Sequence, residues 1–397
     1  KPHPPLFEVR MFFRTEISRA LVYGLAFIVV FACIASVATR AQNQNAGQDS
    51  SRPRRTDATT NAQPQARPTP TPTPGKKDED ITVDSDDVVR VETDLTNILF
   101  TAIDKNKRFI TEMRKEDIRI TEDGTPQEIF TFERQTDRPL SLALLIDTSG
   151  SEERTLPAEK RAAAAFVDSV MRAEKDELAV ISFTGESTLE QGLTGNVARV
   201  RRALERVEFV PPSGYIGGGI VVPGTPPISG TNQSLAGSTA IWESVWVTSE
   251  DVLSQTSDKT RRAIILLTDG EDTISQKKMA EAIERAIKND VVVYAIGIGD
   301  PEYGINEGSL KKLAERTGGR AFFPDDESEL RAAFSQIQLE LRSQFLVAYS
   351  PTNKNRDGSF RKVQIEIVNP DMRKQSLRLN YRQGYFARTV TASTKDE

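Results

Sequence analysis

The stretch Leu142-Ala143-Leu144-Leu145-Ile146-Asp147-Thr148-Ser149-Gly150-Ser151 joins an apolar run directly to a cluster of oxygen-bearing side chains. The run is apolar on both faces, which is typical of a central parallel strand covered by helices. Open α/β sheets bind ligands at the carboxyl ends of such strands. Asp147, Ser149 and Ser151 therefore predict half of a metal site, and their hard oxygen atoms favour Mg²⁺, Mn²⁺ or Ca²⁺ over zinc or copper. The alternative is a strand followed by a polar helix cap.

The composition excludes several classes of function. The chain has 397 residues, with 52 basic and 57 acidic side chains and a formal net charge of -5, so it offers no basic field for nucleic acid. The only histidine is His3 and the only cysteine is Cys33, both ahead of every folded segment predicted below. A Ser-His-Asp or Cys-His catalytic group, a His/Cys zinc site and a disulfide framework are therefore excluded from the folded part.

The first 41 residues predict a signal peptide or membrane anchor. Arg14 and Arg19 precede an apolar stretch over 20–37, and Thr39-Arg40-Ala41 offers a cleavage site. The alternative is an uncleaved anchor, because ~18 apolar residues reach the lower limit for a span. Residues 42–87 contain alternating Thr-Pro and predict a disordered, extended linker. We therefore expect an exported protein that is secreted, periplasmic or on the cell surface and contacts a membrane only through its N-terminal segment.

Residues 138–344 alternate between strand and helix patterns. Apolar strands are predicted at 178–183, 263–268, 291–298 and 321–323. Apolar residues with helical spacing surround Phe166, Ile283 and Phe334. This alternation predicts a Rossmann-like α/β domain, with a mainly parallel sheet and helices on both faces.

Strand patterns return on both sides of that domain, in residues 88–137 and 345–388. Val89 and Val91 begin the first segment, and Asp123-Gly124 predicts a hairpin turn within it. The three strands predicted after residue 344 are too few to form a stable domain alone. We therefore expect them to pair with strands of the first segment in a β-sandwich, followed by a tail over 389–397.

Two further polar clusters lie in the α/β region. Thr268-Asp269-Gly270-Glu271-Asp272 ends a second buried strand, and Gly237-Ser238-Thr239-Ala240 begins a predicted helix through Trp242. Glu271 and Asp272 are interpreted as a solvated cap. The loop over 211–236 is rich in Gly and Pro, and we expect it to shape partner choice.

Asp147-Thr148-Ser149-Gly150-Ser151, Thr239 and Asp269 match, in order and spacing, the metal-ion-dependent adhesion site of von Willebrand factor type A domains. With its export signal, linker and Glu-Asp-Gly hairpin, the chain resembles the bacterial von Willebrand factor A-related proteins over residues 88–388. The resemblance implies that Ser149 and Ser151 bind the metal directly. It further implies that Thr239 binds directly or through water, and Asp147 and Asp269 through bridging waters. One departure is Glu152, where such proteins often have Met; its negative charge puts the affinity for anionic partners in doubt.

The resemblance implies a binding or adhesion protein rather than an enzyme. Its Mg²⁺, with Mn²⁺ or Ca²⁺ as alternatives, would bind an Asp or Glu carboxylate of a protein or extracellular matrix partner. One alternative is a structural component of a cell-surface assembly without metal-dependent binding. The other is a metal-dependent hydrolase such as a phosphatase. The stretch Asp147-Thr148-Ser149 argues against a hydrolase because it supplies neither a second carboxylate nor a basic phosphate clamp.

Overall fold

The computed structural model describes residues 95–211, 215, 222, 237–299 and 304–389. The predicted export segment, the linker, the strand at Val89 and Val91, and most of the 211–236 loop lie outside these residues. None of the helices within the described ranges combines the length and apolar character needed to cross a membrane.

The central strand of the α/β domain is β5 (Leu140–Asp147), which is buried along its whole length. The sheet has the order β10-β9-β8-β5-β6-β7. Strands β6 (Glu177–Phe183) and β8 (Arg261–Thr268) flank β5 in parallel; β9 (Val291–Gly297) and β10 (Ala321–Phe322) continue the sheet. The predicted mainly parallel sheet is therefore confirmed. Its antiparallel edge strand β7 (Ser187–Thr194) was not predicted.

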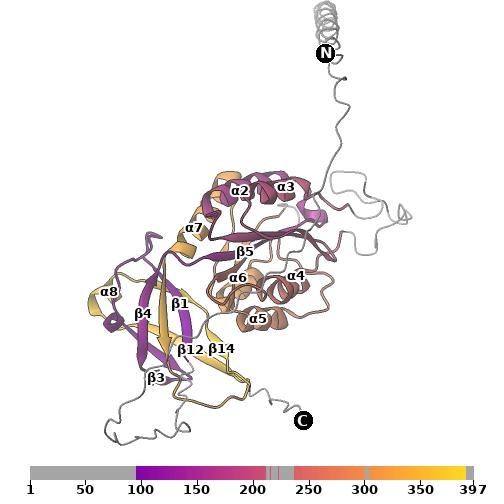
Figure 1. Cartoon of the computed structure of the whole chain (residues 1–397). Helices are drawn as coiled ribbons and strands as arrows, with labels where there is room; N and C mark the ends of the chain where they lie inside the picture. Colours follow the sequence, from indigo (N-terminus) through magenta and orange to yellow (C-terminus); the bar gives the residue numbers. More distant parts are fainter. Residues whose placement is uncertain (1–94, 212–214, 216–221, 223–236, 300–303, 390–397) are drawn as a thin grey trace, which may run out of the picture. The chain divides into compact units, whose positions relative to one another are not determined.

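Helices cover both faces of this sheet (Figure 1). One face packs against α2 (Leu156–Val170), α3 (Val197–Arg206) and α7 (Glu327–Arg342). The other packs against α4 (Ile241–Val247), α5 (Met279–Lys288) and α6 (Glu307–Thr317). Successive side chains of β5 point to opposite faces, so Leu144 lies in the first layer and Leu145 in the second. The sequence pattern did not predict α3 or α6, whose apolar stripes are short.

The flanking segments form two further sheets. One has the order β13-β1-β11-β4 and contains β1 (Thr96–Ile103), β4 (Ile129–Gln135), β11 (Gln344–Tyr349) and β13 (Arg378–Tyr381). The other has the order β14-β12-β2-β3 and contains β2 (Ile118–Glu122), β3 (Thr125–Gln127), β12 (Phe360–Ile367) and β14 (Gly384–Phe386). The inner faces share one core, in which Phe100 and Phe345 of the first sheet pack near Ile120 and Ile365 of the second. The predicted sandwich is thus built from strands on both sides of the α/β domain.

The turn between β2 and β3 is the predicted hairpin turn. Glu122 pairs with Thr125, which leaves Asp123 and Gly124 as a two-residue loop. Both have positive φ, 48° and 84°, as a type I′ turn requires. The remaining short elements are η1 (Lys115–Asp117), η2 (Gly150–Glu152), η3 (Thr248–Leu253) and α8 (Pro370–Lys374).

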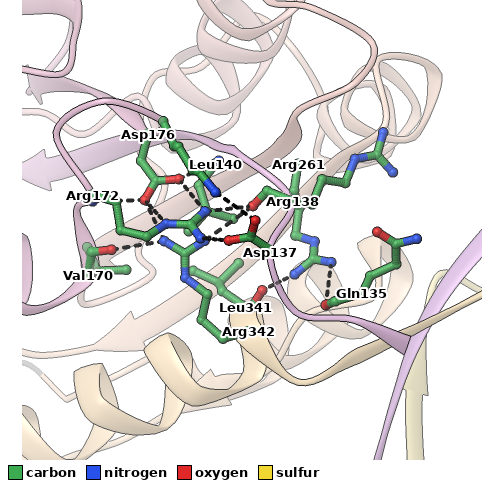
Figure 2. Close-up of polar contacts among 11 residues, drawn as sticks. Gln135, Asp137, Arg138, Leu140, Val170, Arg172, Asp176, Arg261, Leu341 and Arg342 are labelled. Atoms are coloured by element: carbon green, nitrogen blue, oxygen red, sulfur yellow. Dashed lines mark hydrogen bonds and ion pairs between the residues drawn. The ribbon is translucent and has the colours of Figure 1, made fainter. Parts of the chain in front are cut away.

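An ion-pair network holds the two places where the chain passes between the sandwich and the α/β domain (Figure 2). Asp176, which is only 3% exposed, accepts hydrogen bonds from the guanidinium groups of Arg172 and Arg342. Both arginines also donate to the carbonyl of Arg138, between β4 and β5, and Arg261 donates to the carbonyl of Leu341. The network lies at the amino end of β5, because the backbone N–H of Leu140 donates to Asp176.

Candidate metal centre

Asp147 and Asp269 lie next to each other because their strands are adjacent and parallel. Asp147 is the last residue of β5, and Asp269 directly follows β8, with Ile146 paired to Leu267. Asp147 is fully buried: its Oδ2 accepts a hydrogen bond from Thr268 Oγ1 at 2.6 Å, and its Oδ1 accepts one from the Ser149 backbone N–H at 2.9 Å. These bonds fix the orientation of the carboxylate at the carboxyl edge of the sheet.

The two serines belong to the turn that follows β5. Ser149 is the N-cap residue of η2 and Ser151 lies within it. Their Oγ atoms are 3.3 Å apart. The 3₁₀ turn thus brings both hydroxyls together beside Asp147, because the Ser149 N–H is bonded to that carboxylate.

Thr239 is attached to the segment after β8. Its backbone N–H donates to Thr273 Oγ1 at 2.8 Å, and its carbonyl accepts from the Thr273 N–H at 2.9 Å. Its side chain is almost buried, at 4% exposure. Asp272 Oδ1 accepts from the backbone N–H of Ile241 at 2.8 Å, so Asp272 caps helix α4, as the cap interpretation predicts.

Glu152 is the residue of this region that the motif did not identify as a ligand. It is fully buried, and one of its carboxylate oxygens lies within 4.8 Å of one oxygen each of Asp147 and Asp269. The sequence showed its negative charge next to Ser151 but not its burial. The stretch Asp147-Thr148-Ser149 supplies no second carboxylate itself, but the fold brings both Glu152 and Asp269 close to Asp147.

The cluster is electrostatically unfavourable by itself. Burial raises the pKa of Asp147 to about 7, despite the hydrogen bonds from Thr268 and Ser149. Burial and the nearby Glu159 and Asp147 carboxyls raise the pKa of Glu152 well above its usual range. Burial also raises the pKa of Glu159, on α2, to about 7. None of these carboxyls takes part in an ion pair between residues that the structure describes, so each requires either a proton or a bound cation.

The donor set fits a hard divalent cation. It comprises three carboxylates and two hydroxyls, which are oxygen donors only. The three carboxylates each place an oxygen within 4.8 Å of the other two, which is close enough for one hard cation to lie among them. Glu152 Oε1 is buried without a hydrogen-bond partner and so remains available to such an ion. Asp147, Asp269, Ser149, Ser151 and Glu152 are therefore the residues that can hold it, with Thr239 on the adjoining segment.

Comparison with solved structures gives matches at low sequence identity. BatB from Bacteroides thetaiotaomicron, described as a conserved hypothetical protein, is 19% identical over 51% of this chain and all of that chain, with a TM-score of 0.38. A von Willebrand factor type A protein from Catenulispora acidiphila is 14% identical over 71% of this chain and 76% of that chain, with a TM-score of 0.40.

Proximal thread matrix protein 1 from the mussel byssus, in a form whose metal-ion-dependent adhesion site holds zinc, also matches. It is 18% identical over 56% of this chain, with a TM-score of 0.42. This chain spans about half the length of that protein, 50%. A comparison with curated proteins gives no match.

Two models of the von Willebrand factor type A domain match the sequence, one over residues 142–221 and the other over residues 228–336. The matched segments cover β8 and all but the first two residues of β5, and they contain Asp147, Ser149, Ser151, Thr239 and Asp269. Domains of this family commonly mediate adhesion between proteins and are typically interaction modules, not enzymes. The chain therefore contains a von Willebrand factor type A domain, which is its α/β domain.

Proposed function

We propose that the protein is an exported binding module that holds Mg²⁺, Mn²⁺ or Ca²⁺ and uses it to bind a carboxylate of a protein partner. Asp147, Ser149, Ser151, Thr239 and Asp269 would hold the ion. The observation that supports this most directly is the meeting of two buried aspartates and two serine hydroxyls at the carboxyl edge of one sheet.

The chemistry of the donors supports a role in binding. A cation held partly by neutral hydroxyls keeps positive charge that an incoming carboxylate can satisfy. The partner would therefore present Asp or Glu. The only histidine and cysteine of the chain precede the residues that the structure describes, so catalytic groups based on His or Cys are not available to this site.

A metal titration followed by a retention assay tests this function. Purified protein is titrated with Mn²⁺ by calorimetry and then passed over resin carrying glutamate, with glutamine resin as the neutral control. We expect cation-dependent retention on glutamate resin alone, release by EDTA, and loss of both metal binding and retention in Ser149→Ala. Ser169→Ala is the matched control, since its hydroxyl bonds to the Phe166 carbonyl within α2.

Each negative result has a distinct meaning. Absence of cation binding would refute the proposal outright. Cation binding without selective retention on glutamate would leave the ion as a fold-stabilising element and favour a structural component of a surface assembly.

A further inference from the structure

Glu152 has the surroundings of a ligand and not those of a surface acid. It ends η2, directly after Ser151, and is fully buried. Its Oε2 accepts a hydrogen bond from Thr155 Oγ1 at 2.5 Å, which orients the carboxylate. Its Oε1 is buried and has no hydrogen-bond partner. An unpaired oxygen in this position costs free energy unless another group binds it.

A cation bound beside Asp147 and Asp269 would be such a group. One of its carboxylate oxygens lies within 4.8 Å of an oxygen of Asp147 and an oxygen of Asp269. A cation that contacts the two aspartates and the adjacent serine hydroxyls would therefore also be within reach of Glu152. The chain itself then contributes three negative charges around an ion of charge +2.

Glu159 adds to this excess of negative charge. It is fully buried on α2, and neither of its carboxylate oxygens has a hydrogen-bond partner. Like Glu152, it is a buried acid that forms no ion pair with any of the residues that the structure describes.

We propose that Glu152 is a direct ligand of the cation, in addition to the five motif residues. This inference rests on the proposed metal-binding function. The site consequently holds its ion more tightly than the five motif residues alone would.

Substitutions of Glu152 test this inference on the full chain loaded with Mn²⁺. Glu152→Gln preserves the shape and removes the charge, whereas Glu152→Ala empties the coordination position. The neighbouring Glu153→Gln is the matched control, because Glu153 bonds to Tyr215 and lies outside the carboxylate cluster. We expect calorimetry to show ~10- to 100-fold weaker Mn²⁺ binding in both Glu152 variants, the range found when the groups around a metal are altered. The control should bind Mn²⁺ like the wild type.

Water relaxation and acetate binding provide two further readouts. Glu152→Ala should gain one manganese-bound water, seen as a rise in water-proton relaxivity. Acetate should lower that relaxivity at lower concentration in Glu152→Ala than in the wild type, because one negative charge fewer surrounds the ion.

Unchanged Mn²⁺ affinity in Glu152→Gln, or equal manganese hydration in the wild type and Glu152→Ala, would overturn the inference. The hydration of the wild-type protein can be measured by itself, so a poorly folded variant does not prevent the test. Failure of the proposed function has a different signature: Ser149→Ala and Asp147→Asn would then bind Mn²⁺ as well as the wild type does.

Discussion

Replacement of Asp147 by asparagine should have opposite effects on stability with and without metal. Asp147 is fully buried, and the nearby carboxyls of Glu152 and Asp269 add negative charge. Its pKa is about 7 in the folded protein, against 3.8 for the ordinary side chain. The folded state therefore binds this proton more tightly than the unfolded state, and the stability of the metal-free protein falls as pH rises from about 4 to about 7.

The size of this destabilisation follows from the pKa shift of Asp147. A pKa difference of about three units corresponds to about 4 kcal/mol of destabilisation once Asp147 is fully ionised. Asparagine removes that charge but presents an NH₂ group to one of the two donors, Thr268 Oγ1 or the Ser149 N–H, at a cost of about 2 kcal/mol. At pH 8 without metal, Asp147→Asn should therefore be more stable than the wild type by about 2 kcal/mol.

Bound metal should reverse this order of stability and make the wild type more stable than Asp147→Asn. Cation at about 100 times its dissociation constant stabilises the wild type by about 2.7 kcal/mol, and the variant should lose this gain. Thermal unfolding in EDTA and in Mn²⁺ measures both effects, since 1 kcal/mol shifts Tm by about 2–4 °C in a domain of this size. At pH 5 the metal-free advantage of the variant should nearly vanish, because Asp147 of the wild type is then protonated.

Two results would refute this reasoning. One is a variant that is less stable than the wild type in EDTA at pH 8, which would mean that the buried charge is compensated without a cation. The other is a variant that Mn²⁺ stabilises as much as it stabilises the wild type. Asp168→Asn is the control, because Asp168 forms only a solvent-exposed ion pair with Arg201.

Three further substitutions test contacts that stabilise the α/β domain, the turn next to the site and the β-sandwich. Asp176→Ala should destabilise the protein by about 3 kcal/mol because it leaves Arg172 and Arg342 without their buried partner, whereas Asp168→Ala, at an exposed pair, should cost less than about 1 kcal/mol by urea denaturation. Burial opposes ionisation of Asp176, but hydrogen bonds from these arginines lower its pKa to about 2. The ionised Asp176 therefore stabilises the folded state above pH 3.8, the ordinary pKa of aspartate, and this stabilisation disappears as pH falls through about 2. Measuring the free energy of unfolding against acidic pH tests this. Gly270→Ala should weaken Mn²⁺ binding and reduce stability by about 1–3 kcal/mol, because Gly270 has a φ of 87° and a Cβ there would lie 2.9 Å from Leu310 Cγ. Gly192→Ala is the control: a Cβ there meets nothing within 4 Å, so this variant should bind Mn²⁺ normally. Phe100→Ala should cost about 3–5 kcal/mol in chemical denaturation, since this buried ring stacks on Phe345 at 5.3 Å, while Phe130→Ala, at 70% exposure, should change stability by less than about 0.5 kcal/mol.

The sequence determined the α/β class and the edge of the sheet on which the polar residues gather. The apolar runs ending at Asp147 and Asp269 are long enough to be buried strands, and the intervening helices require those strands to be parallel. Parallel strands place their carboxyl ends at one edge of the sheet, so local patterns predict the edge for both aspartates. The resemblance to von Willebrand factor type A domains predicts that they converge, and the pairing of β5 with β8 makes them neighbours. Metal binding by these residues stays a prediction.

Local sequence patterns did not predict the short or highly charged elements. Helix α3 exposes several arginines and buries only Val200, Ala203 and Leu204, too few to give a clear periodicity. Strand β7 has no fully buried residue, so its sequence does not alternate as a half-buried strand does. The Asp176 network joins residues that are far apart in the sequence, and no local motif encodes it.

Only the tertiary structure decided the character of Glu152. In the sequence it is an acid beside a serine motif, equally compatible with solvent. The folded chain buries it and brings its carboxylate within 4.8 Å of those of Asp147 and Asp269. Burial removes the water that would otherwise solvate a carboxylate, and a carboxylate without water requires a proton or a cation. That requirement is a property of the packed environment, which a linear pattern of residues does not specify.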